Sequence, residues 1–149
     1  MKHETIKFPL AALVLFFLAS PKAALAEIIR IEFTKFDTYN MEIVHIKVGD
    51  TVEWLPTNEG HNVEFIIAPS VVALPEKSKM NEYHSMIFNA PGIYVYGCTP
   101  HLNTGMLGLI VVGDDFHNIE DTNQVDLSPV AQSVLKRLIK RAKAASKSS

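Results

Sequence analysis

Short apolar runs between residues 28 and 112 constrain the fold of this chain more than any other feature. Each run is rich in β-branched or aromatic residues and ends near Gly, Pro, Asn or Asp, which is typical of strands joined by turns. The runs cover residues 28–34, 43–48, 51–55, 62–66, 84–88, 93–96 and 107–112. About seven or eight short strands in so short a segment predict a mainly β fold, with two sheets packed as a sandwich.

The N-terminal end has a different pattern. Lys2 and Lys7 are followed by an apolar run over residues 9–19 and then by Ala24-Leu25-Ala26, as in a secretory signal peptide cleaved before Glu27. An uncleaved anchor is the alternative, but this run is short for a membrane span, which needs roughly 20 residues. We therefore expect residues 1–26 to be removed and residues 27–149 to form one exported, monomeric domain without stable insertion into a membrane.

The C-terminal end changes from strand to helix period. Ser128 and Pro129 form an N-cap and a first-turn proline, and apolar residues then recur at helical spacing as far as Ala142. A short extra helix is expected over residues 115–120. The opposite face is basic, so the long helix either packs on the sandwich or lies on a membrane surface. Packing is favoured because surface helices of globular proteins have this pattern. We therefore expect the domain to consist of a sandwich (27–113) followed by a helical extension with a tail (114–149).

The distribution of charge excludes one class of partner. Between residues 27 and 126 there are five Lys or Arg residues against fifteen Asp or Glu residues. The compensating positive charges lie further on, between residues 136 and 147. A domain this acidic is not expected to bind nucleic acid, which selects basic surfaces.

One loop and one upstream histidine carry the ligands of a metal site. Cys98, His101 and Met106 lie within nine residues of each other, and His61 follows a glycine. Two imidazoles, a thiolate and a weak axial thioether are the ligands that copper prefers, so we predict one copper ion. A lone exported cysteine cannot form an internal disulfide, and an ordinary buried cysteine would leave the spacing of His101 and Met106 unexplained. Zinc is the alternative for Cys-x2-His, but structural zinc sites do not use methionine.

The segments around these residues resemble the cupredoxin family and, within it, the pseudoazurins. The motifs are Gly60-His61-Asn62-Val63-Glu64, Cys98-Thr99-Pro100-His101 and Gly105-Met106. The resemblance implies a Greek-key sandwich with a C-terminal helical extension and a type 1 copper site held by the four ligands. It also implies that Asn62 ties the two ligand segments together and that its backbone amide points at the cysteine sulfur. Thr99 follows that cysteine, and Pro100 lacks the N–H that would donate a second hydrogen bond to the sulfur.

The resemblance further implies an electron carrier of the bacterial periplasm. Cys98 is flanked by Gly97 and Thr99, whereas copper oxidases and nitrite reductases place a histidine next to this cysteine to reach a second copper, so we do not expect an enzyme. Transient redox partners are expected, such as cytochrome c or a nitrite or respiratory reductase. A copper-delivery protein and a copper redox subunit of a larger complex are the alternatives.

The expected docking surface is the apolar patch around the second histidine, formed by Pro56, Pro100 and Leu102. Pseudoazurins usually surround this patch with lysines, but here Glu59 and Gly97 occupy two of those positions. The usual acidic-faced partner, a nitrite reductase, is therefore in doubt. Three other histidines have no soft partner nearby in the sequence and are not expected to be ligands, namely His45, His84 and His117.

Overall fold

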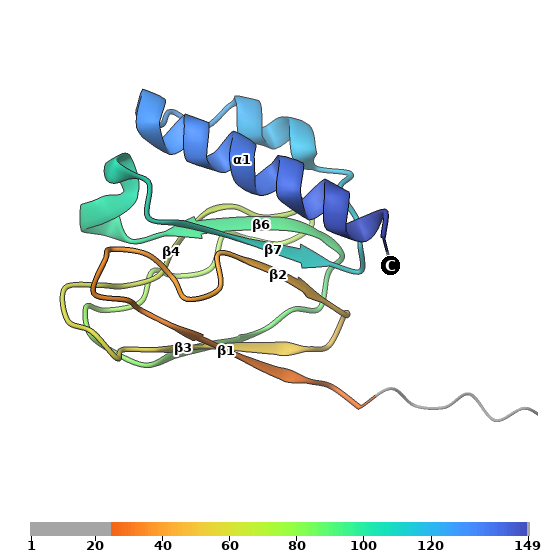
Figure 1. The fold of residues 1–149 in the computed structure, drawn as a ribbon. Helices are drawn as coiled ribbons and strands as arrows, with labels where there is room; N and C mark the ends of the chain where they lie inside the picture. Colours follow the sequence, from red (N-terminus) through yellow and green to blue (C-terminus); the bar gives the residue numbers. More distant parts are fainter. Residues whose placement is uncertain (1–24, 149) are drawn as a thin grey trace, which may run out of the picture.

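Two stacked sheets and a helix make up the computed structural model, which describes residues 25–148 (Figure 1). One sheet has the order β1-β3-β5 and contains β1 (Ile28–Glu32), β3 (Thr51–Leu55) and β5 (His84–Ile87). The other has the order β2-β7-β6-β4 and contains β2 (Ile43–Ile46), β7 (Leu107–Val112), β6 (Gly92–Gly97) and β4 (Glu64–Ile67). The pairs β1–β3 and β2–β7 are parallel and the others are antiparallel. The predicted mainly β, two-sheet sandwich is confirmed.

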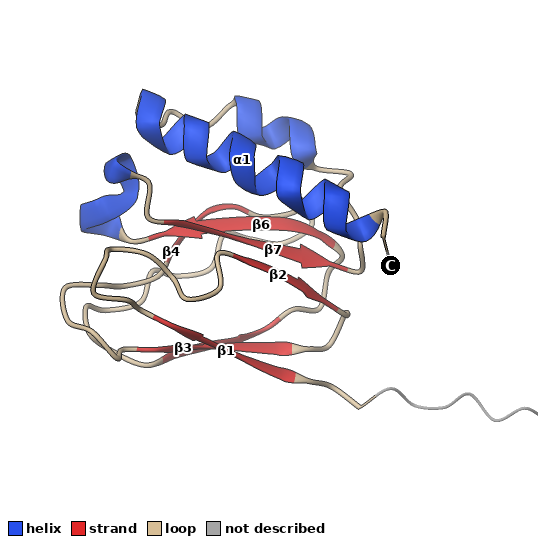
Figure 2. Ribbon diagram, viewed as in Figure 1, coloured by secondary structure: helices blue, strands red, loops and turns tan. Residues whose placement is uncertain are grey.

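The helix α1 (Pro129–Ser146) lies across the outer face of the four-stranded sheet, as Figure 2 shows. Its N-cap is as predicted, because the Ser128 hydroxyl accepts a hydrogen bond from the Ala131 amide at 3.1 Å. Leu135 and Leu138 are buried against the sheet, so the structure agrees with packing on the sandwich. The described part of the chain has no helix whose length and apolar character would let it cross a membrane.

Strands β6 and β7 are buried on both faces, and this gives the domain two cores. Alternate residues such as Tyr96 pack with Trp54 and Phe65 between the sheets. The others, such as Val95, pack with Leu135 beneath α1. Because the two strands are held from both sides, their ends form a fixed base for the loops that follow them.

Some boundaries differ from the sequence predictions. The fourth strand begins at Glu64 rather than at residue 62, which leaves His61 in the preceding loop. The extra helix expected over residues 115–120 is wrong in position, since η2, a 3-10 helix, spans Ile119–Asn123. The physical reason is Asn118, whose side chain bonds both the N–H and the C=O of Ile93 and ties this segment to β6. The predicted signal peptide lies almost wholly outside the described residues.

Candidate metal centre

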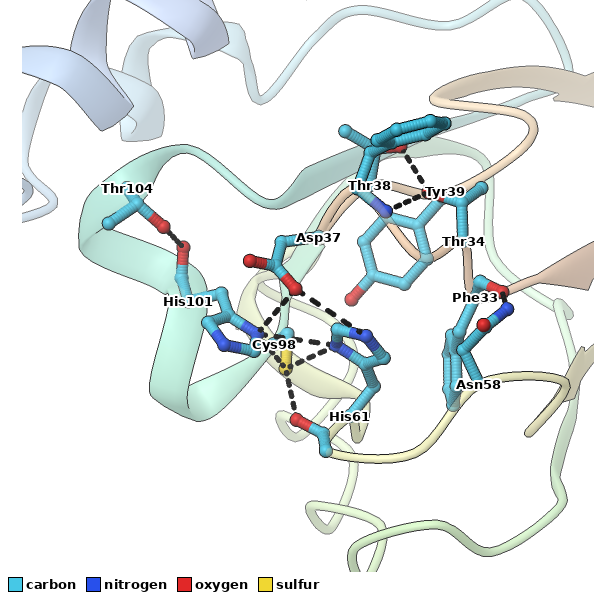
Figure 3. A network of polar contacts seen from close by, with 12 residues as sticks. Phe33, Thr34, Asp37, Thr38, Tyr39, Asn58, His61, Cys98, His101 and Thr104 are labelled. Carbon is cyan, nitrogen blue, oxygen red and sulfur yellow. Dashed lines mark hydrogen bonds and ion pairs between the residues drawn. The ribbon is translucent and has the colours of Figure 1, made fainter.

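Three of the predicted ligands meet at one end of the sandwich (Figure 3). The Sγ atom of Cys98 lies 3.6 Å from Nδ1 of His61 and 3.6 Å from Nδ1 of His101. The two Nδ1 atoms are 3.2 Å apart. A point equidistant from the corners of this triangle lies about 2.0 Å from each, close to the roughly 2.0–2.1 Å of a metal–imidazole bond. The donor atoms and their spacing therefore fit a single ion with two nitrogen ligands and one sulfur ligand.

Two separate chain segments supply these ligands. His61 comes from the loop before β4, whereas Cys98 follows β6 directly and His101 lies in η1 (Thr99–Thr104), a 3-10 helix. Since β4 and β6 are paired, the end of that strand pair brings the two segments together. The site therefore forms with the sheet and not before it.

Met106 closes the ligand loop next to the start of β7. Its backbone N–H donates to the carbonyl of His101 at 3.1 Å, and its carbonyl accepts from the Cys98 amide at 3.2 Å. The residue is 1% exposed and belongs to the same core cluster as Cys98. Gly105 gives the preceding turn its positive φ of 99°, which favours glycine.

Asn62 joins the two ligand segments through its side chain. Its Oδ1 accepts from the Thr99 amide at 2.8 Å, and its Nδ2 donates to the Thr99 hydroxyl at 2.9 Å. A longer bond runs from Nδ2 to the carbonyl of Ser78 at 3.4 Å. Asn62 is 2% exposed, so few of these bonds can be exchanged for water. This is the tie that the resemblance implies between the neighbours of His61 and Cys98.

The C-terminal helix supports the other side of the ligand loop. The Ser128 hydroxyl donates to the carbonyl of Asn103 in η1 at 2.6 Å. A Cβ at Gly105 would come 2.9 Å from Cγ2 of Val134, so α1 and the loop are in direct contact. The loop is thus held between the inner core and α1.

Burial sets the protonation of the centre. Burial raises the pKa of the Cys98 thiol. The backbone N–H groups of Asn62 and His101 oppose this, because they stabilise the thiolate and so lower the same pKa. Burial lowers the pKa of His61, and the neighbouring His101 lowers that pKa further. The protein without a metal thus favours the thiol and the neutral imidazole, and binding a metal ion releases the thiol proton.

Sequence reasoning missed one residue at this centre, Asp37. Its Oδ1 lies 3.7 Å from Nε2 of His61 and 3.8 Å from Nδ1 of His101, and Figure 3 shows the carboxylate between the two rings. It belongs to a turn after β1 that has no ligand motif. No sequence signal points to it, because the proximity arises only when the loops fold over the end of the sandwich.

The other histidines of the described residues do not join the group. His45 faces Asp114 at 3.0 Å, His117 faces Asp115 at 3.0 Å, and the ring of His84 lies 5.5 Å from that of Trp54. Within residues 25–148, the ligand atoms of His61, Cys98 and His101 lie within 4.8 Å of one another, and none of these three histidines shares that cluster.

The structure also explains one departure from the lysine-rich rim. Gly97 is buried in β6, and a Cβ there would come 2.4 Å from Cδ1 of Leu102 and 2.9 Å from the carbonyl of Met106. A lysine does not fit at this position while Leu102 keeps its place. Leu102 is accordingly half-buried, whereas Pro56 and Pro100 of the expected patch are exposed.

A β-sandwich that carries a His-Cys-His cluster at one end defines a metal-binding domain, and residues 25–148 contain one such cluster. Residues 29–113, more than half of the chain, match the model of the copper-binding proteins of the plastocyanin/azurin family. The chain belongs to this family, its cofactor is copper, and its cluster is consistent with a type 1 copper site.

Individual relatives agree with this assignment. The chain is 42% identical over 79 residues to a pseudoazurin of Paracoccus pantotrophus, covering 52% of this chain and 54% of that protein. It is 34% identical over 99 residues to a pseudoazurin of Methylorubrum extorquens AM1, covering 65% and 66%. The crystal structure of a pseudoazurin from Methylobacterium extorquens AM1 superposes with a TM-score of 0.69 at 28% identity, covering 76% of this chain and 98% of that one. The resemblance to pseudoazurins is confirmed, although the matches span only half to two thirds of the curated relatives' length.

Proposed function

We propose that this chain is a type 1 copper electron carrier whose ligands are His61, Cys98, His101 and Met106. The observation that carries the proposal is the triangle of two Nδ1 atoms and one Sγ atom, with sides of 3.2, 3.6 and 3.6 Å. Bound copper would supply one-electron chemistry by alternating between Cu(I) and Cu(II). Met106, buried beside Cys98 in the core cluster, is the candidate for the weak axial ligand.

The surrounding residues suit a centre that changes little between oxidation states. Asn62 and Thr99 hold the two ligand segments by a pair of hydrogen bonds, and α1 supports η1 from outside. His61 is 2% exposed, whereas the His101 side chain is 27% exposed. His101 is thus the ligand that a redox partner can approach.

Burial of the ligands favours a carrier over a copper-delivery protein. A delivery protein needs ligands that an acceptor can reach and displace, but Cys98 and Met106 are 0% and 1% exposed. The set of four also leaves no coordination position for a substrate, which argues against an enzyme. A redox subunit of a larger complex would show its permanent partner in pull-down experiments from cells.

We further propose export to the periplasm through a signal peptide over residues 1–26, and brief encounters with a cytochrome c or a reductase. Pro100, next to His101 in the chain, and Pro56 are both exposed and would form the apolar part of the contact. Glu59 and Gly97 replace lysines of the rim, so electron exchange with an acidic-faced reductase should depend weakly on salt. A steep fall in rate on adding salt would contradict this.

The proposed centre is tested by adding Cu(II) to the metal-free protein and recording its visible spectrum. One equivalent should produce an intense thiolate-to-copper band, which a mediator should bleach and restore reversibly. Cys98→Ser removes the sole thiol and should abolish the band, while His45→Gln, outside the cluster, should leave it intact. Copper uptake without the band, or a band that survives Cys98→Ser, would refute the proposal.

A further inference from the structure

A negative charge lies at the edge of the proposed copper centre, and among the described residues it forms ion pairs with histidines alone. Asp37 Oδ1 is 3.8 Å from Nδ1 of His101, one of the three atoms that face the centre. A copper ion bound about 2 Å from that nitrogen would therefore lie within about 6 Å of the carboxylate oxygen. Among residues 25–148, the ion-pair partners of Asp37 are His61 and His101 and include no lysine or arginine.

Hydrogen bonds fix the turn that carries this carboxylate. The Thr34 amide donates to the Thr38 carbonyl at 2.9 Å, and the hydroxyls of Thr34 and Thr38 lie 2.7 Å apart, which closes a turn around Asp37. Asp37 has a φ of 53°, a left-handed conformation that Asp and Asn tolerate better than most residues. The side chain is 55% exposed, yet Figure 3 shows its carboxylate directed towards the two imidazoles.

The carboxylate faces two of the proposed ligands at once. Its Oδ1 lies 3.7 Å from Nε2 of His61 and 3.8 Å from Nδ1 of His101, and these two histidines come from different chain segments. A metal ion held by both histidines would experience the field of this charge.

We propose that Asp37 sets the redox preference of the centre, by favouring Cu(II) over Cu(I) through its fixed negative charge. The inference rests on the proposed function. The reaction concerned is the loss of one electron from Cu(I) to a mediator, and a nearby anion favours the state with the higher positive charge. Asp37 thus acts through space and not as a copper ligand, and it keeps the midpoint potential lower than the four ligands alone would give.

Two substitutions remove the charge and keep the turn. Asp37→Asn is isosteric and Asp37→Gly also tolerates a positive φ. In each variant the ratio of Cu(II) to Cu(I) at a fixed applied potential should fall about tenfold, which for one electron is a rise of about 59 mV in midpoint potential. The thiolate-to-copper band should keep its position and intensity.

Glu120→Gln provides a matched control. Glu120 lies in η2, just after Asn118, which is bonded to Ile93 at the opposite end of β6 from Cys98. Cys98 lies five residues further along the chain than Ile93, a distance of about 16 Å for extended strand, which exceeds the screening length of about 8–10 Å at moderate salt. Its midpoint potential should match that of the unchanged protein.

The outcomes separate this inference from the proposed function. An unchanged or lower potential in both Asp37 variants, with a reversible couple in the parent protein, would overturn the role of Asp37 alone. A shifted band or a large loss of copper affinity in Asp37→Asn would overturn it too, because the carboxylate would then be a ligand. Absence of any reversible couple in the parent protein would overturn the proposed function and the inference with it.

Discussion

The asparagine that joins the two ligand segments offers the sharpest test of how the fold supports the site. Asn62→Ala removes two hydrogen bonds to Thr99, of 2.8 and 2.9 Å, and a longer one to Ser78. At about 1 kcal/mol net for each good bond, the free energy of unfolding of the metal-free protein should fall by about 2–3 kcal/mol. In a domain of this size, that is a fall in melting temperature of about 10 °C. Urea unfolding of the metal-free protein measures the loss.

Copper affinity should fall as well, because the bonds to Thr99 hold His61 and Cys98 in register. Outer partners of metal ligands typically contribute about 10–100-fold to affinity, and competition with a chelator measures this. Asn118→Ala is the control: Asn118 is also buried and bonds the N–H and C=O of Ile93 at 2.8 and 2.9 Å, at the far end of β6. It should lose similar stability and keep its copper affinity. Equal losses of affinity in the two variants would refute the reasoning.

Three further predictions follow from contacts elsewhere. Gly97→Ala should lower the free energy of unfolding by about 1–3 kcal/mol, because its Cβ would lie 2.4 Å from Leu102, and Leu102→Ala in the same chain should recover part of this in urea melts. Two backbone N–H groups lower the pKa of buried Asp50. Ionised Asp50 should therefore stabilise the fold fully above the usual aspartate pKa of about 3.9, and this stabilisation should be lost as the pH falls through the lower pKa that Asp50 has in the folded protein. Thermal melts from neutral to acid pH should show this loss, and Asp50→Asn should flatten it. Pro100→Ala should raise the midpoint potential by adding a backbone N–H near the Cys98 sulfur, and an unchanged or lower value in voltammetry would contradict this.

Features encoded locally in the sequence were predictable. The runs that form β6 and β7 are continuously apolar because both faces of these strands are buried. The start of α1 was readable because Ser128 and Pro129 act within one helical turn. Cys98, His101 and Met106 were recognisable as one group because a single tight loop carries them.

Features that arise only from long-range packing were not predictable. Asp37 is 24 residues from His61 and 61 from Cys98, and its distance to them depends on how a turn after β1 meets loops of the other sheet. The boundary of η2 was missed for a similar reason, since Asn118 makes its deciding bonds with Ile93 across the fold. In both cases a polar side chain finds a partner that no local pattern specifies.

The same packing connects the electrostatics of the rim to the fold. A lysine before Cys98 would need the space that Leu102 occupies, and Leu102 packs with the core beneath α1. The packing of the ligand loop on β6 thus leaves no room for a lysine at residue 97, and a single substitution there cannot add the charge without displacing Leu102. Together with Glu59 and Asp37, this leaves the ligand end of the sandwich with less positive charge than a lysine-rich rim would have. The same negative charge that disfavours an acidic partner would also favour Cu(II). Substitutions that add positive charge at this end of the sandwich should therefore change partner preference and midpoint potential together.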